Sequence, residues 1–82
     1  MRKMMQPVEV IGHFNKEGTV TPYRFKMDNY VIKIERVQTF NIDMFSGNIL
    51  NVYDCKVVIN EFEKVIQVKY EIKTCRWYLT RI

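Results

Sequence analysis

Three side chains in this sequence could bind a soft metal ion: His13, Cys55 and Cys75. Structural zinc sites use four such ligands, usually with two close pairs in the chain, and here no two of the three are close. Cys55 falls on the inward side of a predicted strand and Cys75 at a predicted turn, out of reach for a disulfide. We therefore expect a buried small hydrophobic residue and an exposed thiol, with no metal and no cofactor.

The sequence offers little for nucleophilic or acid–base catalysis. Ser46 is the only serine and His13 the only histidine, and nothing ties one to the other or to a third, orienting group. Glu61 and Glu63 flank a predicted turn, where solvent surrounds them rather than a pocket. The three glycines are too widely spaced for a phosphate-binding loop. The sequence thus predicts a binding protein rather than an enzyme.

A basic strand face is the first candidate binding site. If Asp28-Asn29 forms a two-residue hairpin turn, Arg24 lies directly opposite Lys33, and Lys26 shares their outward face. Like charges placed opposite one another cost stability unless an anion lies between them. This face therefore predicts a site for an anion or a nucleic-acid backbone, although a solvated surface explains the same residues.

A cluster of large apolar side chains is the second candidate. Four of them fall within six residues of a segment that we expect to be an irregular strand or a loop: Phe40, Ile42, Met44 and Phe45. They either cap one end of the fold or form an exposed patch, which monomers rarely leave open. The second alternative predicts self-association, by edge-strand pairing or by exchange of this segment, and hence a homodimer.

Composition sets the fold that must position these groups. The chain has 82 residues, 19 of them Val or Ile and only two Leu, with no Ala. Branched and aromatic side chains lose freedom in a helix and pack well on a sheet. The net charge of +4 is spread along the chain, and no apolar stretch reaches the length of a membrane span. We expect one all-β domain over residues 7–82, after a frayed segment at 1–6.

Turn signals at regular intervals predict an antiparallel meander of about six strands. Asn15 and Gly18 suit the first and fourth positions of a type I turn, and Pro22 predicts a sheet edge or a bulge. Residues 39–48 stay open between an irregular strand, a closing loop and a single helical turn. Strands are expected at residues 8–14, 19–27, 30–37, 49–59 and 64–73, and around Trp77.

The predicted registers place one apolar face inside. A four-residue turn at residues 60–63 sets Cys55 opposite Val68, and a tight turn at residues 74–75 sets Tyr70 opposite Leu79. Six strands with one apolar face must curl into a barrel or a strongly coiled sheet. The expected interior is Tyr23, Phe25, Ile32, Ile34, Tyr53, Cys55, Val57, Ile66, Val68, Tyr70, Ile72, Trp77 and Leu79.

Several short runs resemble a known group of proteins. They are Pro7-Val8-Glu9-Val10-Ile11, Thr21-Pro22-Tyr23-Arg24-Phe25, Ile32-Lys33-Ile34-Glu35-Arg36-Val37 and Trp77-Tyr78-Leu79. The order of these runs is similar to that in short uncharacterised proteins from Firmicutes. It is more loosely similar to a domain of unknown function in actinobacterial proteins, some of them associated with translesion DNA polymerases. The resemblance implies a bacterial protein and a weak link to nucleic acids, and it carries no catalytic residues.

These observations favour a non-enzymatic small β-barrel module that acts by binding. The alternative is a nucleic-acid-binding accessory protein that uses the basic strand face. Two cysteines cannot form a dense disulfide framework, and no signal-peptide pattern opens the chain. We therefore expect a cytoplasmic protein with no membrane partner and no known small-molecule ligand.

Overall fold

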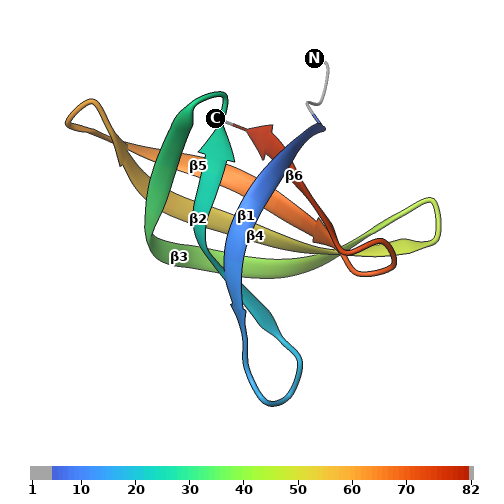
Figure 1. Cartoon of the computed structure of the whole chain (residues 1–82). Helices are drawn as coiled ribbons and strands as arrows, with labels where there is room; N and C mark the ends of the chain where they lie inside the picture. Colours follow the sequence, from blue (N-terminus) through green and yellow to red (C-terminus); the bar gives the residue numbers. More distant parts are fainter. Residues whose placement is uncertain (1–4, 82) are drawn as a thin grey trace.

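Alternating apolar and polar residues form six strands in the computed structural model, which describes residues 5–81. The strands are β1 (Gln6–Phe14), β2 (Val20–Met27), β3 (Tyr30–Phe45), β4 (Asn48–Ile59), β5 (Phe62–Glu71) and β6 (Arg76–Arg81). Each pairs antiparallel with the next, and β1 pairs with β6 to close a barrel (Figure 1). The predicted all-β meander is confirmed, in its closed form.

The first strand begins slightly earlier than expected. Residues 1–4 of the predicted frayed segment lie outside the described residues. Gln6, by contrast, already belongs to β1 and lies opposite Leu79 of β6. Only residues 6–8 of β1 pair with β6, so the barrel closes over a short stretch.

The β1–β2 turn forms as predicted. The backbone N–H of Gly18 donates to the Asn15 carbonyl oxygen at 2.9 Å, and Gly18 has a φ of 86°. The Asn15 side-chain oxygen also accepts from the backbone N–H groups of Glu17 and Thr19, at 3.0 and 2.9 Å. Asparagine at the first turn position thus holds three backbone donors through its two oxygens.

A β-bulge in β2 follows from Pro22, which has no N–H to give to the ladder. Pro22 lies opposite Gly12, and the register shifts at this point, leaving Tyr23 as the extra residue. A Cβ on Gly12 would lie 3.0 Å from the Val20 side chain, so glycine permits the close approach. The bulge leaves Tyr23 exposed while Phe25 is buried, and the prediction of Tyr23 in the core is therefore wrong.

The β2–β3 hairpin has the predicted two-residue turn. Asp28 and Asn29 connect the strands, with Met27 opposite Tyr30. Asp28 has a φ of 55°, a conformation that Asp tolerates better than most residues. The hairpin register is confirmed for the four residue pairs nearest the turn.

The β4–β5 register differs from the prediction by two residues. Asn60 and Glu61 form a two-residue turn, with φ values of 51° and 69°, in place of the expected four-residue turn. Cys55 consequently lies opposite Ile66 rather than Val68. Because side chains alternate with a period of two, the shift keeps every side chain on its predicted face.

The β5–β6 register is also shifted by two residues. The turn spans residues 72–75, and Cys75, with a φ of 59°, donates its backbone N–H to the Glu71 carbonyl oxygen at 2.8 Å. Tyr70 therefore lies opposite Trp77 rather than Leu79. Ile72 belongs to the turn and is exposed, so its predicted place in the core is wrong.

Residues 39–48 form neither a loop nor an irregular strand. β3 continues without interruption to Phe45, and the two-residue turn Ser46-Gly47, with φ values of 51° and 80°, leads into β4. These angles are those of a type I′ turn, whose twist matches that of a hairpin. The tip of this hairpin projects from the barrel, at the right in Figure 1.

The core fills the barrel with side chains from β2 to β6. Cys55, Val57, Ile66, Val68 and Leu79 are fully buried. Val8 of β1 and Trp77 of β6, which pair where the barrel closes, pack against this core, as does Val10 of β1. The remaining core residues are Val20, Phe25, Ile32, Ile34, Tyr53 and Tyr70.

Candidate functional site

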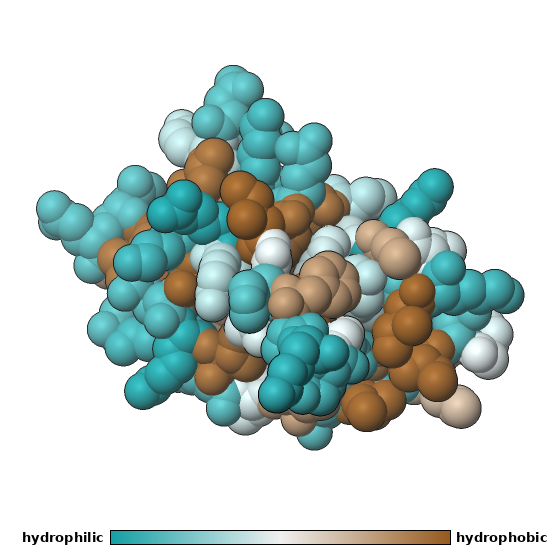
Figure 2. Space-filling view, turned by 60° about the horizontal axis from the view of Figure 1, so that its bottom comes forward, coloured by the Kyte–Doolittle hydropathy of each residue, from teal (hydrophilic) through white to brown (hydrophobic). Residues whose placement is uncertain are grey.

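The outer part of the β3–β4 hairpin carries the predicted apolar cluster; we call residues 39–52 the β3–β4 arm. Phe40, Ile42 and Met44 alternate along β3 and share one face, with exposed fractions of 46, 66 and 69%. Phe45 is also exposed but lies on the opposite face, because it is one residue out of phase. Hydrophobic side chains gather at the right of Figure 2, the side on which the arm lies in Figure 1. The structure thus brings three of the four predicted residues together.

A row of five aromatic rings runs from this face into the barrel. The Phe40 ring lies 5.2 Å from Tyr53, Tyr53 lies 5.7 Å from Trp77, and Trp77 lies 4.7 Å from Tyr70. Phe14 of the β1–β2 hairpin meets Tyr70 at 6.2 Å. Phe14 and Phe40 are exposed at the two ends of the row, so the apolar face of the arm is continuous with the barrel core. Sequence reasoning placed the three inner rings in the core but did not connect them to Phe40.

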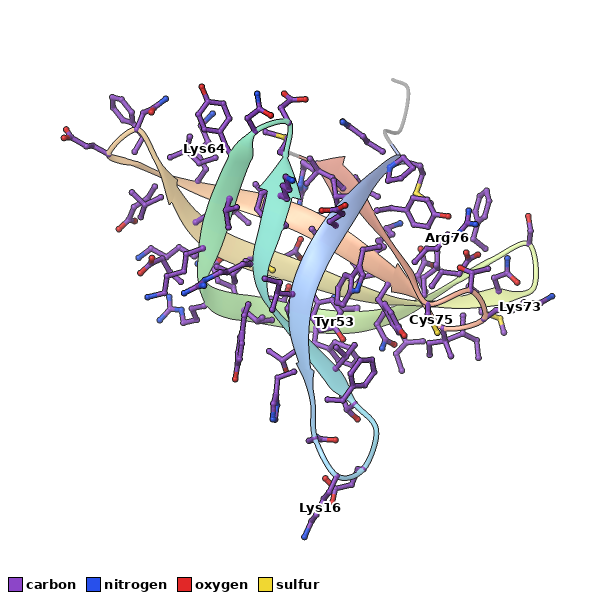
Figure 3. All side chains as sticks on the ribbon, in the orientation of Figure 1. Lys16, Tyr53, Lys64, Lys73, Cys75 and Arg76 are labelled. Carbon is purple, nitrogen blue, oxygen red and sulfur yellow. The ribbon has the colours of Figure 1, made fainter. Side chains whose placement is uncertain are left out.

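Tyr53 anchors this row through its hydroxyl, which donates a hydrogen bond to the Val20 carbonyl oxygen on β2. Figure 3 shows Tyr53 pointing across the barrel from β4. The Asn51 amide lies 3.5 Å from the same hydroxyl. Burial raises the pKa of Tyr53 above its usual value, because the phenolate would lose its hydration. The neutral hydroxyl is therefore a structural contact between β4 and β2.

The predicted basic face exists on β2 and β3. Arg24 lies opposite Lys33, and Lys26 lies opposite Val31 on β3 and Glu9 on β1. All three cations are exposed, and within residues 5–81 none of them has a carboxylate within salt-bridge distance. The like-charge pair is therefore left without an anion.

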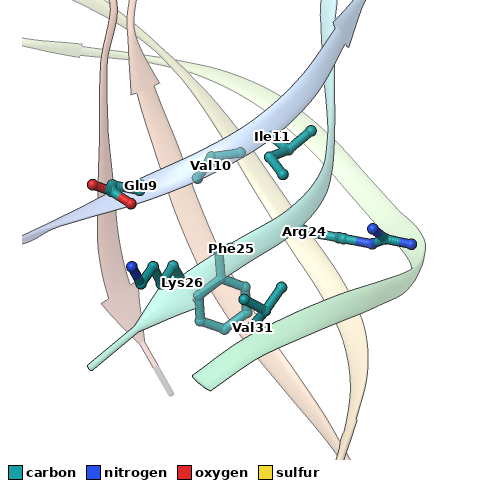
Figure 4. A pocket seen from close by; sticks show the side chains of 7 residues that line it. All are labelled: Glu9, Val10, Ile11, Arg24, Phe25, Lys26 and Val31. Atoms are coloured by element: carbon teal, nitrogen blue, oxygen red, sulfur yellow. The ribbon is translucent and has the colours of Figure 1, made fainter. Parts of the chain in front are cut away.

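A shallow pocket of about 240 Å³ opens beside Arg24 and Lys26, with Phe25, Val10 and Val31 among its apolar lining. In Figure 4, Glu9 and Lys26 lie on one side of this pocket and Arg24 extends away on the other. The pocket wall next to Arg24 is thus the more positive one.

A further cation extends this face along β3. Arg36 lies opposite Lys56 of β4 and is exposed. The Lys56 ammonium is paired with the Glu63 carboxylate at 3.0 Å, so Arg36 alone adds free positive charge. Sequence reasoning missed Arg36 because the bulge at Glu35 shifts the alternation, and no turn signal marks that bulge.

The residues considered for metal binding or catalysis stay apart. Burial raises the pKa of the Cys55 thiol to about 12, whereas Cys75 is an exposed free thiol near Lys73 and Arg76, at the β5–β6 turn in Figure 3. His13 stacks on the Tyr23 ring at 6.1 Å. Among residues 5–81, no three His, Cys, Asp or Glu side chains are grouped as metal ligands would be. Within the part of the chain that the structure describes, these groups form no shared centre.

Comparison with known proteins gives no relative of this chain. No family model, no curated protein and no solved structure matches it. The resemblance to short Firmicutes proteins and to the polymerase-associated domain therefore stays a prediction. In residues 5–81 there is no helix of the length and apolarity that crossing a membrane requires.

Proposed function

We propose that this protein is a non-enzymatic binding module that self-associates as a homodimer through the β3–β4 arm. The observation that carries the proposal is the exposure of Phe40, Ile42 and Met44 on one face of a projecting strand. Soluble monomers rarely leave such a contiguous apolar patch open to water. The continuity of this face with the barrel core, through the Phe40–Tyr53 contact, holds it in a fixed orientation suited to a partner.

The test is the mass of the native protein in solution. Sedimentation equilibrium over a wide range of concentrations should approach twice the chain mass of 9.9 kDa. Ile42→Lys should shift the equilibrium to the single chain. Ile11→Lys is the matched control, because Ile11 has a similar exposure, 62%, but lies on β1, away from the arm. A single-chain mass at every concentration would remove the proposal.

A second candidate function is binding of a nucleic-acid backbone on the basic face. Its support is the pair of Arg24 and Lys33, which lie opposite each other without an anion. A polyanion placed between them would relieve their repulsion and release counterions. Arg36 lengthens the face along β3, which suits a polymer better than a single small anion.

Fluorescence anisotropy with single- and double-stranded oligonucleotides at low salt tests this second function. Affinity should fall as salt rises, and the double variant R24E/K33E should weaken it strongly. Lys16→Glu is the control, since Lys16 lies at the tip of the β1–β2 hairpin (Figure 3) and carries the same charge. If both variants bind equally, or if the native protein binds neither oligonucleotide, the basic face does not serve this function.

We also propose a bacterial, cytoplasmic setting. The bacterial part is supported by the resemblance to short Firmicutes proteins. The cytoplasmic part is supported by the pair of free cysteines, one buried and one exposed, since reducing compartments preserve such thiols. Counting reactive thiols in protein taken directly from cells under acid quench tests it. Two reduced cysteines are expected, and an intermolecular disulfide through Cys75 would contradict it.

A further inference from the structure

The outer edge of β3 has no strand beside it in the arm. β2 pairs with β3 only over residues 30–33, and residues 39–45 pair with β4 alone. Among the described elements, β3 has no neighbour other than β2 and β4, and every residue from Thr39 to Phe45 is exposed. An open edge of this kind presents unpaired backbone groups, which are a template for another strand.

The turn at Ser46-Gly47 determines which backbone groups face the open edge. In a two-residue hairpin the flanking pair, Phe45 and Asn48, exchanges hydrogen bonds, and such pairs then recur at every second residue. Asn41 and Asp43 therefore direct their N–H and C=O groups to β4. The residues between them, Phe40, Ile42 and Met44, direct theirs outward; these are the same residues whose apolar side chains are exposed.

Two hydrogen bonds agree with this alternation of backbone groups between the open edge and β4. The backbone N–H of Met44 donates to the side-chain Oδ1 of Asp43 at 2.9 Å, rather than to β4. Across the arm, the carbonyl oxygen of Ile49, opposite Met44, accepts from the N–H of Ile72 at 3.2 Å. Ile49 thus points its backbone groups toward β5, as the alternation requires. Among the described residues, no strand pairs with β3 on the side that the N–H groups of Phe40 and Ile42 face.

We propose that two copies of the chain pair antiparallel through this edge, about a two-fold axis at Ile42. This pairing rests on the self-association proposed above and specifies its contacts. Ile42 then lies opposite Ile42 of the partner subunit, and Phe40 lies opposite Met44 of the partner subunit. Because an antiparallel strand pair is symmetric about its centre, the same edge serves both copies and the assembly closes as a dimer.

Side-chain chemistry on both faces of the strand selects this register. On the polar face, Asn41 lies opposite Asp43 of the partner subunit, so an amide donor meets a carboxylate acceptor. A shift by two residues toward the turn would set Asp43 opposite its own copy, and like charges directly opposite are destabilising. A shift the other way would set Met44 against Gln38 of the partner subunit, at the second bulge of β3. Only the register centred on Ile42 buries all three apolar side chains.

A hydrogen bond within each chain competes with this pairing. Asp43 already accepts from the Met44 N–H and must release it when that N–H turns to the partner strand. The paired edge spans seven residues, about 23 Å. An interface of one short strand pair is small beside the roughly 800 Å² per partner of stable complexes, so the dimer is reversible and depends on concentration.

Hydrogen exchange on the unmodified protein tests the pairing residue by residue. The amides of Phe40 and Ile42 should exchange freely in dilute protein and slow by about tenfold or more where the dimer forms. The amides of Asn41 and Asp43, which face β4, should be protected at both concentrations. Equal exchange of Ile42 in dimer and monomer would overturn the pairing.

Disulfide trapping gives a second, independent readout. In a Cys75→Ser background, which leaves only the buried Cys55, Ile42→Cys should oxidise to a covalent dimer because the two Cα atoms lie at the spacing of paired strands. Asn41→Cys is the neighbouring control and should cross-link much more slowly. A native dimer with equal cross-linking of both variants would overturn the pairing but not self-association. A native monomer would overturn both.

Discussion

The Lys69 ammonium lies 3.4 Å from the Asp43 carboxylate, although the two residues stand on strands that do not touch. Lys69 is on β5, Asp43 is on β3, and β4 lies between them. The Lys69 side chain therefore passes over Leu50 and Val52, which are only 2 and 7% exposed on the outer face of the sheet. Its methylene groups cover apolar residues, and its ammonium, on a side chain that is only 9% exposed, meets the half-exposed Asp43 carboxylate.

Truncation of Lys69 should therefore destabilise the barrel through lost packing more than through lost charge. Lys69→Ala should lower the free energy of unfolding by about 1–2 kcal/mol, because it uncovers Leu50 and Val52. Lys69→Met keeps the apolar stem and should cost under about 1 kcal/mol. Urea denaturation measures both changes, and an equal loss in the two variants would show that the ion pair dominates.

Removal of the Tyr53 hydroxyl should weaken the link between β4 and β2. Tyr53→Phe leaves the buried Val20 carbonyl oxygen and the Asn51 amide without their shared partner. An unsatisfied buried polar group costs about 1–3 kcal/mol, so we expect a loss of about that size in thermal or urea unfolding. Tyr30→Phe, on a 70% exposed tyrosine, is the control and should change stability by less than about 0.5 kcal/mol. A loss no greater in Tyr53→Phe than in this control would contradict the structural role of the hydrogen bond.

The all-β fold and the inward faces of most strands could be predicted from the sequence. Side chains alternate between the two faces of a sheet, so a register that is wrong by two residues still places each side chain on the correct face. The two wrong registers arose where the backbone is left-handed without glycine. Glu61 and Cys75 both have positive φ, a conformation that their residue types do not signal. The sequence therefore predicts a turn at residues 60–63 that is longer than the observed one, and a turn at residues 74–75 that is shorter than the observed one.

Pro22 marks the bulge in β2, as predicted, but no residue type marks the bulges in β3 or its open edge. A bulge reverses the inward–outward alternation of the side chains that follow it. The bulge in β2 turns Tyr23 outward, and the bulge at Glu35 in β3 turns Arg36 to the outer face. The alternation of Phe40, Ile42 and Met44 is a strand pattern, but its neighbours decide whether it is core or surface. Only the structure shows that β2 leaves β3 before this segment begins.

Asp54 should make stability depend on pH in the acid range. A hydrogen bond from the Thr39 hydroxyl, with further support from Gln67 and Arg81, holds the pKa of Asp54 below its usual 3.8. The folded state thus binds this proton less readily than the unfolded chain. The stability contributed by Asp54 is complete above about pH 5 and is lost as pH falls through 3.8 and then through the lowered folded pKa.

Unfolding measured between neutral and acid pH should separate this contribution from that of the other carboxyl groups. Thr39→Val removes the largest cause of the pKa shift and should flatten the fall in stability in acid, and Asp54→Asn should flatten it further. Asp28→Asn in the β2–β3 turn is the control. If the acid slope of Asp54→Asn equals that of the native protein, the Asp54 hydrogen bonds do not contribute to it.

The Arg24–Lys33 pair leads to a prediction about stability that also bears on function. Reversing one charge, in Lys33→Glu, converts repulsion into an exposed cross-strand attraction and should stabilise the fold by about 0.2–1 kcal/mol at low salt. The double reversal R24E/K33E places two carboxylates opposite each other and should lose that gain, and salt should shrink both effects. Urea unfolding of the four members of this cycle measures the pair directly.

If Lys33→Glu stabilises the barrel yet abolishes oligonucleotide binding, the like-charge pair is maintained at a cost in stability for an anionic ligand. If it stabilises the barrel and leaves binding unchanged, the two cations are simply two solvated side chains.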